Sequence, residues 1–109
     1  MKLLFLCSQN KRRSLTAEKI LNGVNGWNVR SAGTESNARN KVTIGHIGWA
    51  DVIFTMEKKH TRRIQERFRG EMMDKKIVCL YISDDYEFMD RELIAMLKEQ
   101  VLGYLDEIN

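Results

Sequence analysis

Cys7, Arg13 and Ser14 are the residues in this sequence whose types and spacing could carry out chemistry. Cys7 ends a short apolar run, a wholly polar stretch follows, and Arg13 and Ser14 then open a helical pattern. At such a junction the N–H groups of the loop, the dipole of the helix and a bidentate arginine all attract a tetrahedral oxyanion. The same positive field favours the thiolate form of Cys7, a nucleophile able to attack phosphorus. We expect the Ser14 hydroxyl to donate a hydrogen bond to that thiolate.

The polar stretch between Cys7 and Arg13 is expected to bind the anion or to shape the loop around it. Its residues are Ser8, Gln9, Asn10, Lys11 and Arg12. Asn10 tolerates the left-handed backbone that a reversing loop requires, so we expect it to shape the loop without reacting. Lys11 and Arg12 are expected to add positive potential at the mouth as solvated charges. The alternative for Cys7 taken alone is a small apolar residue that ends a buried strand.

Apolar runs that alternate with helical patterns predict the elements that position this site. Strands are predicted at 2–7, 27–31, 52–56 and 77–82, with a turn at 32–34. Helices are predicted at 14–24, 57–69 and 94–108, and a loop with one short helix at 35–50. Strands that are apolar on both faces are typical of a parallel sheet covered by helices on both sides. We therefore predict an α/β fold, a three-layer sandwich with a four-stranded parallel sheet. Ligands should bind beyond the carboxyl ends of its strands, where the loops after Cys7, Met56 and Ile82 open.

The length and charge of the chain limit the classes of function. Its 109 residues suit one domain spanning residues 1–109. Lys and Arg number 18 against 15 Asp and Glu, and this net charge of +3 suits a phosphate-bearing ligand but lacks the clustering typical of a nucleic-acid binder. The basic run at 58–69 is interpreted as a solvated helix face, so nucleic acid is not an expected partner. No apolar run reaches the ~18–20 residues that cross a bilayer, so no membrane partner is expected either.

Cysteine and histidine usage indicates a reduced, metal-free protein. No export signal is visible, and Cys7 and Cys79 are the two cysteines, so we expect reduced thiols in the cytoplasm. Cys79 lies inside a predicted strand and is interpreted as a core residue. His46 and His60 are too isolated to suggest a metal site, and we interpret both as structural.

Residues 4–14 resemble the phosphate-binding loop of the low-molecular-weight protein tyrosine phosphatases. Residues 29–34 are similar to the family's second strand and its Ser-Ala-Gly-Thr turn, and residues 50–56 to its Ala-Asp strand ending in Met. Residues 83–86 stand where the family has an Asp-Pro loop before its last helix. Together these segments cover most of the chain, in the order that the family has.

The resemblance implies a phosphotyrosine phosphatase I-like fold and a cysteine-dependent phosphatase that hydrolyses phosphate monoesters, with protein phosphotyrosine as the expected substrate. Cys7 would attack phosphorus to form a phosphocysteine, while Arg13 and the loop amides stabilise the equatorial oxygens. Asp84 would protonate the leaving group and then activate water. Tyr86 matches a position at which family members line the pocket with an aromatic ring. No metal or organic cofactor is implied; the expected partners are a phosphorylated protein or small phosphoester, and a phosphate or sulfate anion in the loop.

Several positions depart from the family pattern. Gln9 replaces a usual glycine and puts a side chain near the phosphate, and Asp85 replaces the proline whose ring helps to fix the acid loop. Which of Asp84 and Asp85 is the general acid therefore stays open. Arg12 stands where many members carry a second cysteine, so a loop disulfide is excluded. The chain is also shorter than typical members between the second and third strands, which predicts a shallower and less aromatic cleft.

Three alternative functions remain open on these residues. Gln9 and the missing proline suit a non-catalytic module that binds phosphate or a phosphoprotein. An arsenate reductase on the same scaffold needs further thiols, and Cys79 alone is left to serve. A phosphocarrier is phosphorylated on a loop cysteine too, but Arg13 argues against it because such carriers typically lack that arginine.

Overall fold

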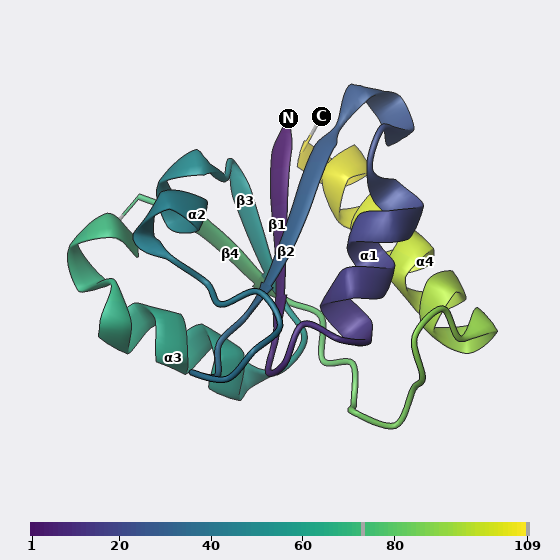
Figure 1. The fold of residues 1–109 in the computed structure, drawn as a ribbon. Helices are drawn as coiled ribbons and strands as arrows, with labels where there is room; N and C mark the ends of the chain where they lie inside the picture. Colours follow the sequence, from purple (N-terminus) through teal and green to yellow (C-terminus); the bar gives the residue numbers. More distant parts are fainter. Residues whose placement is uncertain (73, 109) are drawn as a thin grey trace.

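A four-stranded, all-parallel sheet forms the centre of the molecule in a computed structural model that describes residues 1–72 and 74–108 (Figure 1). The strands stand in the order β2-β1-β3-β4. The elements in chain order are β1 (Lys2–Cys7), α1 (Arg13–Leu21), the 3₁₀ turn η1 (Val24–Gly26), β2 (Asn28–Gly33), α2 (Ile44–Trp49), β3 (Val52–Thr55), α3 (Lys58–Arg67), the 3₁₀ turn η2 (Arg69–Met72), β4 (Lys76–Cys79) and α4 (Arg91–Ile108). The predicted α/β class and four-stranded parallel sheet are confirmed.

Helices cover both faces of the sheet, as Figure 1 shows, with α1 and α4 on one face and α2 and α3 on the other. The side chains of β1 alternate between the two layers. Leu3, Phe5 and Cys7 pack in the cluster that includes α1 and α4, whereas Leu4 and Leu6 pack in the cluster beneath α2. Because both faces of β1 are buried, its sequence is a continuous apolar run, as expected of a central parallel strand.

Three strands end at positions other than those predicted, and β3 differs by a single residue, ending at Thr55. β2 continues to Gly33, so the predicted turn at 32–34 is largely strand. β4 ends at Cys79 instead of residue 82, because the chain turns away at Tyr81, which has a left-handed backbone with φ 54° and is 72% exposed. The amides of Leu80 and Ile82 nevertheless donate to the carbonyls of Thr55 and Met56 at 2.8 and 2.9 Å. The chain after β4 therefore stays beside β3.

The helices follow the predicted pattern, with α1 and α3 shorter than predicted and α4 longer, because α4 begins at Arg91. α1 ends at Leu21 and Gly23 follows with φ 90°, a conformation that glycine adopts at no steric cost. α2 is the one short helix expected within 35–50. α3 exposes its basic residues and buries Ile64, as predicted for a solvated helix face. Over the described residues, none of the helices has the length and apolar character needed to cross a membrane.

Candidate active site

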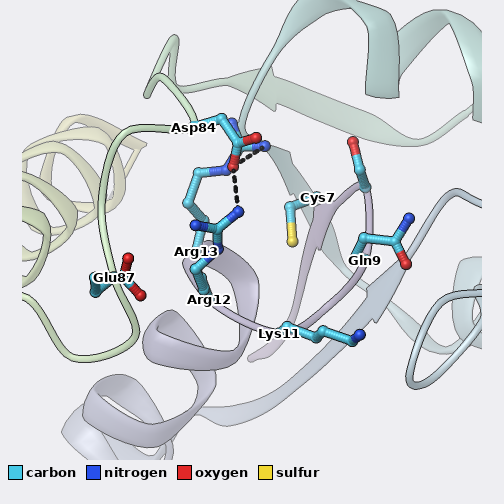
Figure 2. Close-up of a pocket in the computed structure, with 8 residues that line it drawn as sticks. Cys7, Gln9, Lys11, Arg12, Arg13, Asp84 and Glu87 are labelled. Atoms are coloured by element: carbon cyan, nitrogen blue, oxygen red, sulfur yellow. Dashed lines mark hydrogen bonds and ion pairs between the residues drawn. The ribbon is translucent and has the colours of Figure 1, made fainter.

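A cavity of about 470 Å³ opens at the carboxyl end of β1, beside the start of α1 (Figure 2). Its walls come from the loop after β1, the first turn of α1 and the segment after β4. The lining residues are Cys7, Ser8, Gln9, Lys11, Arg12, Arg13, Asp84 and Glu87. Figure 2 shows Asp84 and Glu87 on one side of the Cys7 sulfur and Gln9 on the other. All of these except Glu87 were predicted from the sequence.

The backbone around Cys7 offers a row of N–H donors. Within the described part of the chain, the amides from Ser8 to Ser14 have no hydrogen-bond acceptor, and the first intrahelical bond of α1 runs from the Thr16 amide to the Arg12 carbonyl at 2.8 Å. Arg12 caps the helix without a side-chain hydrogen bond. These donors and the positive end of the helix dipole are therefore available to an oxyanion.

A chain of hydrogen bonds reaches the Cys7 sulfur from Arg39. Arg39 donates from Nη2 to Asn10 Oδ1 at 2.8 Å and from Nε to the Asn10 carbonyl at 3.0 Å. Because arginine can only donate, the amide nitrogen of Asn10 must face Ser14 Oγ, 2.8 Å away. The Ser14 oxygen thus accepts from Asn10, and its own proton is available to the Cys7 sulfur at 3.0 Å; the Ala32 carbonyl is farther, at 3.4 Å.

Asn10 and Ser14 are therefore placed behind the nucleophile and do not line the cavity. Asn10 is fully buried with φ 58°, the left-handed backbone that was expected of it where the loop reverses. Ser14 is also fully buried, and its contact with Cys7 is the one predicted.

Arg13 is held by hydrogen-bond acceptors from the segments that follow β3 and β4. Its side chain is 3% exposed, and Nη1 donates to Glu57 Oε2 at 2.5 Å and to the Ile82 carbonyl at 2.8 Å. Nη2 lies 3.6 Å from Asp84 Oδ1. Burial works to raise the pKa of Glu57, but the hydrogen bond and charge of Arg13 outweigh it, so this pKa lies below its ordinary value. Glu57 thus holds Arg13 as an ionised partner.

His60 contacts the loop from the first turn of α3. Its Nδ1 accepts from the Glu57 amide at 3.0 Å, and its Nε2 lies 3.0 Å from Ser8 Oγ. Burial, followed by the charge of Arg13, lowers the pKa of His60 to about 4. The interpretation of His60 as purely structural is therefore incomplete, and the Glu-x-x-His capping pattern after β3 was the signal that sequence reasoning missed.

Gln9 is accommodated without a special backbone conformation. Within the described residues it is not among those with positive φ, so glycine is not required there. Its Nε2 donates to Asn37 Oδ1 at 3.2 Å, which holds the side chain at the cavity wall. The Arg39 amide also donates to the Gln9 carbonyl at 3.0 Å.

The segment after β2 braces the loop along its length. The amides of Thr34 and Glu35 donate to the carbonyls of Cys7 and Ser8 at 2.9 and 3.0 Å. Gly33 permits this close approach, because a Cβ there would lie 2.6 Å from the Ser8 carbonyl oxygen. The short connection between β2 and β3 thus supplies the loop's outer support.

The structure separates the two neighbouring aspartates. Asp84 lines the cavity, and its Oδ1 lies 3.3 Å from Arg12 Nη2, a contact drawn in Figure 2. Asp85 instead accepts from Ser83 Oγ at 2.9 Å and is absent from the lining. Tyr86 does not line the cavity either. Its ring packs against the core cluster with α1 and α4, where it gains more from apolar contact than at a charged rim. The predicted aromatic wall is thus not formed by Tyr86.

The chemistry of the walls is polar. None of the lining residues is aromatic, in keeping with the predicted less aromatic cleft. Across residues 1–72 and 74–108, no group of three His, Cys, Asp or Glu side chains is placed to hold a metal ion. Cys79 is a half-buried free thiol that lies outside this cavity.

Known proteins share this architecture. No protein-family model and no curated protein matches the chain. The YwlE arginine phosphatase from Geobacillus stearothermophilus matches with 21% identity and a TM-score of 0.70, over 97% of this chain and 94% of that one. The tyrosine phosphatase Wzb from Escherichia coli K30, solved in complex with phosphate, matches with 16% identity and a TM-score of 0.76, over 99% and 98%. The low molecular weight protein tyrosine phosphatase SP-PTP from Streptococcus pyogenes matches with 16% identity and a TM-score of 0.73, over 99% and 93%. The fold implied by the sequence resemblance is therefore confirmed.

Proposed function

We propose that this protein is a metal-independent, cysteine-dependent phosphatase of the low-molecular-weight type. Cys7 attacks the phosphorus of a phosphorylated side chain or small phosphoester in line with the leaving group, whose bond to phosphorus breaks as the S–P bond forms. Asp84 gives the leaving group its proton, then takes a proton from the water that hydrolyses the phosphocysteine and releases phosphate. The reduced thiol that this reaction needs suits the cytoplasm, where we propose that the protein acts.

One observation carries the proposal: Cys7 opens a loop whose amides have no acceptor within the described residues, and its sulfur lies 3.0 Å from the Ser14 hydroxyl, closer than the Ala32 carbonyl does. The amides and Arg13 match the three equatorial oxygens of a phosphoryl group in transfer. A strand-ending core cysteine requires none of this. Arg13 is already held by Glu57, so little reorganisation is needed when the anion binds.

Protein phosphotyrosine remains the expected substrate, and one feature of the wall favours a second candidate. Glu87 contributes a carboxylate that makes no ion pair within the described part of the chain, and it faces the cavity together with Asp84. A carboxylate in that position favours a cationic leaving group over a phenol. Because a structural neighbour is an arginine phosphatase, protein phosphoarginine is the second candidate.

The geometry of the cavity also bears on the three alternative functions. An arsenate reductase would need a second thiol near Cys7, and Cys79 lies outside the cavity. A phosphocarrier does not need Arg13, which is fixed here by two acceptors. A non-catalytic binding module uses the same amides, so turnover must be measured to separate it from an enzyme.

The test is hydrolysis of p-nitrophenyl phosphate without added metal from pH 5 to 8. We expect turnover by the wild type and by Cys79→Ser, and a loss of at least about 1,000-fold in Cys7→Ser. Rapid quenching followed by mass spectrometry should find phosphate on Cys7. A wild type that binds inorganic phosphate but never turns over would instead identify a binding module.

Peptides separate the two candidate substrates. Matched phosphotyrosine and phosphoarginine peptides are compared with the wild type and with Glu87→Gln. If the leaving group is cationic, Glu87→Gln lowers kcat/KM for the phosphoarginine peptide severalfold more than for the phosphotyrosine peptide. Equal effects on both would remove the argument for phosphoarginine.

A further inference from the structure

The protonation state of the His60 ring follows from its two partners. The Glu57 amide can only donate, so the Nδ1 that faces it at 3.0 Å must carry a lone pair. The one proton of the neutral ring is then on Nε2, which faces Ser8 Oγ at 3.0 Å. His60 therefore donates to Ser8, and the Ser8 oxygen accepts.

This assignment frees the proton of the Ser8 hydroxyl. With its oxygen accepting from His60, Ser8 has no other side-chain partner within the described residues. Ser8 lines the cavity directly after Cys7, and it is the one hydroxyl among the lining residues. Its free proton is therefore available to an oxygen atom of an anion in the cavity.

We infer that His60 is a positioning residue that orients Ser8 as a hydrogen-bond donor to a phosphoryl oxygen beside Cys7. The inference rests on the proposed function and adds a side-chain donor to the backbone amides of the loop. Glu57 is the N-cap of α3 and His60 lies in its first turn, so the start of one helix orients both Arg13 and Ser8.

The neutral ring that this arrangement requires is stable at ordinary pH. His60 is 1% exposed, and burial together with the positive charge of Arg13 disfavours a second proton. A proton on Nδ1 would face the Glu57 amide donor and break that contact. The ring therefore keeps one acceptor and one donor across the range in which phosphatase assays are run.

The test is a double-mutant cycle in which calorimetry at pH 7 measures the affinity of each variant for inorganic phosphate. His60→Asn keeps an oxygen near the Nδ1 position for the Glu57 amide but is too short to reach Ser8. Ser8→Ala removes the hydroxyl, and His60→Gln restores an N–H donor at the Nε2 position. We expect Ser8→Ala and His60→Asn each to weaken phosphate binding about 10-fold, the double variant no more than either alone, and His60→Gln to recover most of the loss.

Independent effects would overturn the inference: losses that multiply in the double variant, or phosphate affinity within twofold of wild type in His60→Asn. Should His60→Asn fail to fold, ¹⁵N spectra of the imidazole in the wild type and in Ser8→Ala decide the question. The inference predicts a neutral ring protonated on Nε2 whose resonance moves in Ser8→Ala, and a proton on Nδ1 excludes it.

Calorimetry needs no turnover, so the two proposals can fail separately. A wild type that hydrolyses p-nitrophenyl phosphate without coupling between Ser8 and His60 contradicts this inference and leaves the phosphatase proposal standing. Coupled phosphate binding without hydrolysis contradicts the phosphatase and supports the role of His60. A wild type that does not bind phosphate contradicts both.

Discussion

The carboxylate of Glu57 accepts a hydrogen bond from Arg13 at 2.5 Å, although the two residues are 44 positions apart. Arg13 is the first residue of α1, which follows β1, and Glu57 caps α3, which follows the neighbouring strand β3. A buried guanidinium needs a counter-charge, and Glu57 supplies it at Nη1, while Nη2 lies 3.6 Å from Asp84 Oδ1. This contact joins the stability of the fold to the chemistry of the cavity.

Glu57→Gln is predicted to reduce both stability and activity. It leaves the buried guanidinium without its ionised partner, so we expect the free energy of unfolding to fall by about 1–3 kcal/mol and kcat/KM to fall about 10-fold. Urea unfolding and the p-nitrophenyl phosphate assay measure the two effects. The matched control is Glu35→Gln, which breaks an exposed pair with Arg63 at 3.2 Å and should cost under about 1 kcal/mol. Equal losses in the two variants would contradict the role of Glu57.

Arg39→Lys is predicted to slow the reaction without touching the cavity. Lysine cannot make both of the bonds that Arg39 donates to the carbonyl and the side-chain oxygen of Asn10, so the Asn10 amide is held less firmly against Ser14. We expect kcat/KM to fall about 10-fold and alkylation of Cys7 by iodoacetamide at pH 7 to slow in parallel. Arg62→Lys, at an exposed position on α3, is the control and should change neither rate. An unchanged alkylation rate in Arg39→Lys would show that Arg39 does not influence the Cys7 thiol.

Asp84 and Asp85 are predicted to differ in catalysis. Asp84 lines the cavity and Asp85 does not, so we expect Asp84→Asn to lower kcat for phenyl phosphate about 100-fold and Asp85→Asn to change it less than threefold. The loss in Asp84→Asn should be smaller for p-nitrophenyl phosphate, because that leaving group needs less help from an acid. The reverse ranking of the two variants would assign the acid role to Asp85.

Protonation of His60 is predicted to make stability depend on pH. The pKa of His60 is about 4 in the folded protein against an ordinary value of 6.5, so the unfolded chain takes up the proton first as pH falls. The stabilisation is complete above about pH 6.5 and is lost as pH falls toward 4. Between pH 7 and 5 this amounts to about 2 kcal/mol. Urea unfolding of the wild type and of His60→Asn at both pH values isolates the effect. If the free energy of unfolding falls equally in the two proteins between pH 7 and 5, another group is responsible.

Gly33→Ala is predicted to disrupt the loop. The added methyl group would lie 2.4 Å from Ala38 Cβ and 2.6 Å from the Ser8 carbonyl oxygen, so the loop or its brace must move. We expect a loss of about 3 kcal/mol in the free energy of unfolding and weaker phosphate binding. Gly48→Ala is the control, because nothing lies within 4 Å of its added carbon, and it should be neutral or stabilising by about 0.5–1 kcal/mol. Similar behaviour of the two variants would refute the close approach at Gly33.

Local sequence patterns determined the fold class and the nucleophilic loop. A strand buried on both faces must be apolar at every position, which is why β1 was predicted with its observed bounds. Cys7, Arg13 and Ser14 are close in sequence, so their meeting depends on one loop and one helix start. The left-handed backbone of Asn10 is also a local property, and it could be predicted because asparagine tolerates that conformation.

Tertiary structure decided the residues that hold this loop in place. Arg39, Glu57 and His60 lie 29, 44 and 52 positions from their partners in the loop. Such contacts depend on the order and register of the strands, which bring the ends of β1 and β3 together. Residue type and spacing carry no record of that register. The reactive residues of the site could thus be predicted from a local motif, whereas the residues that hold them in place are identified only by the folded sheet.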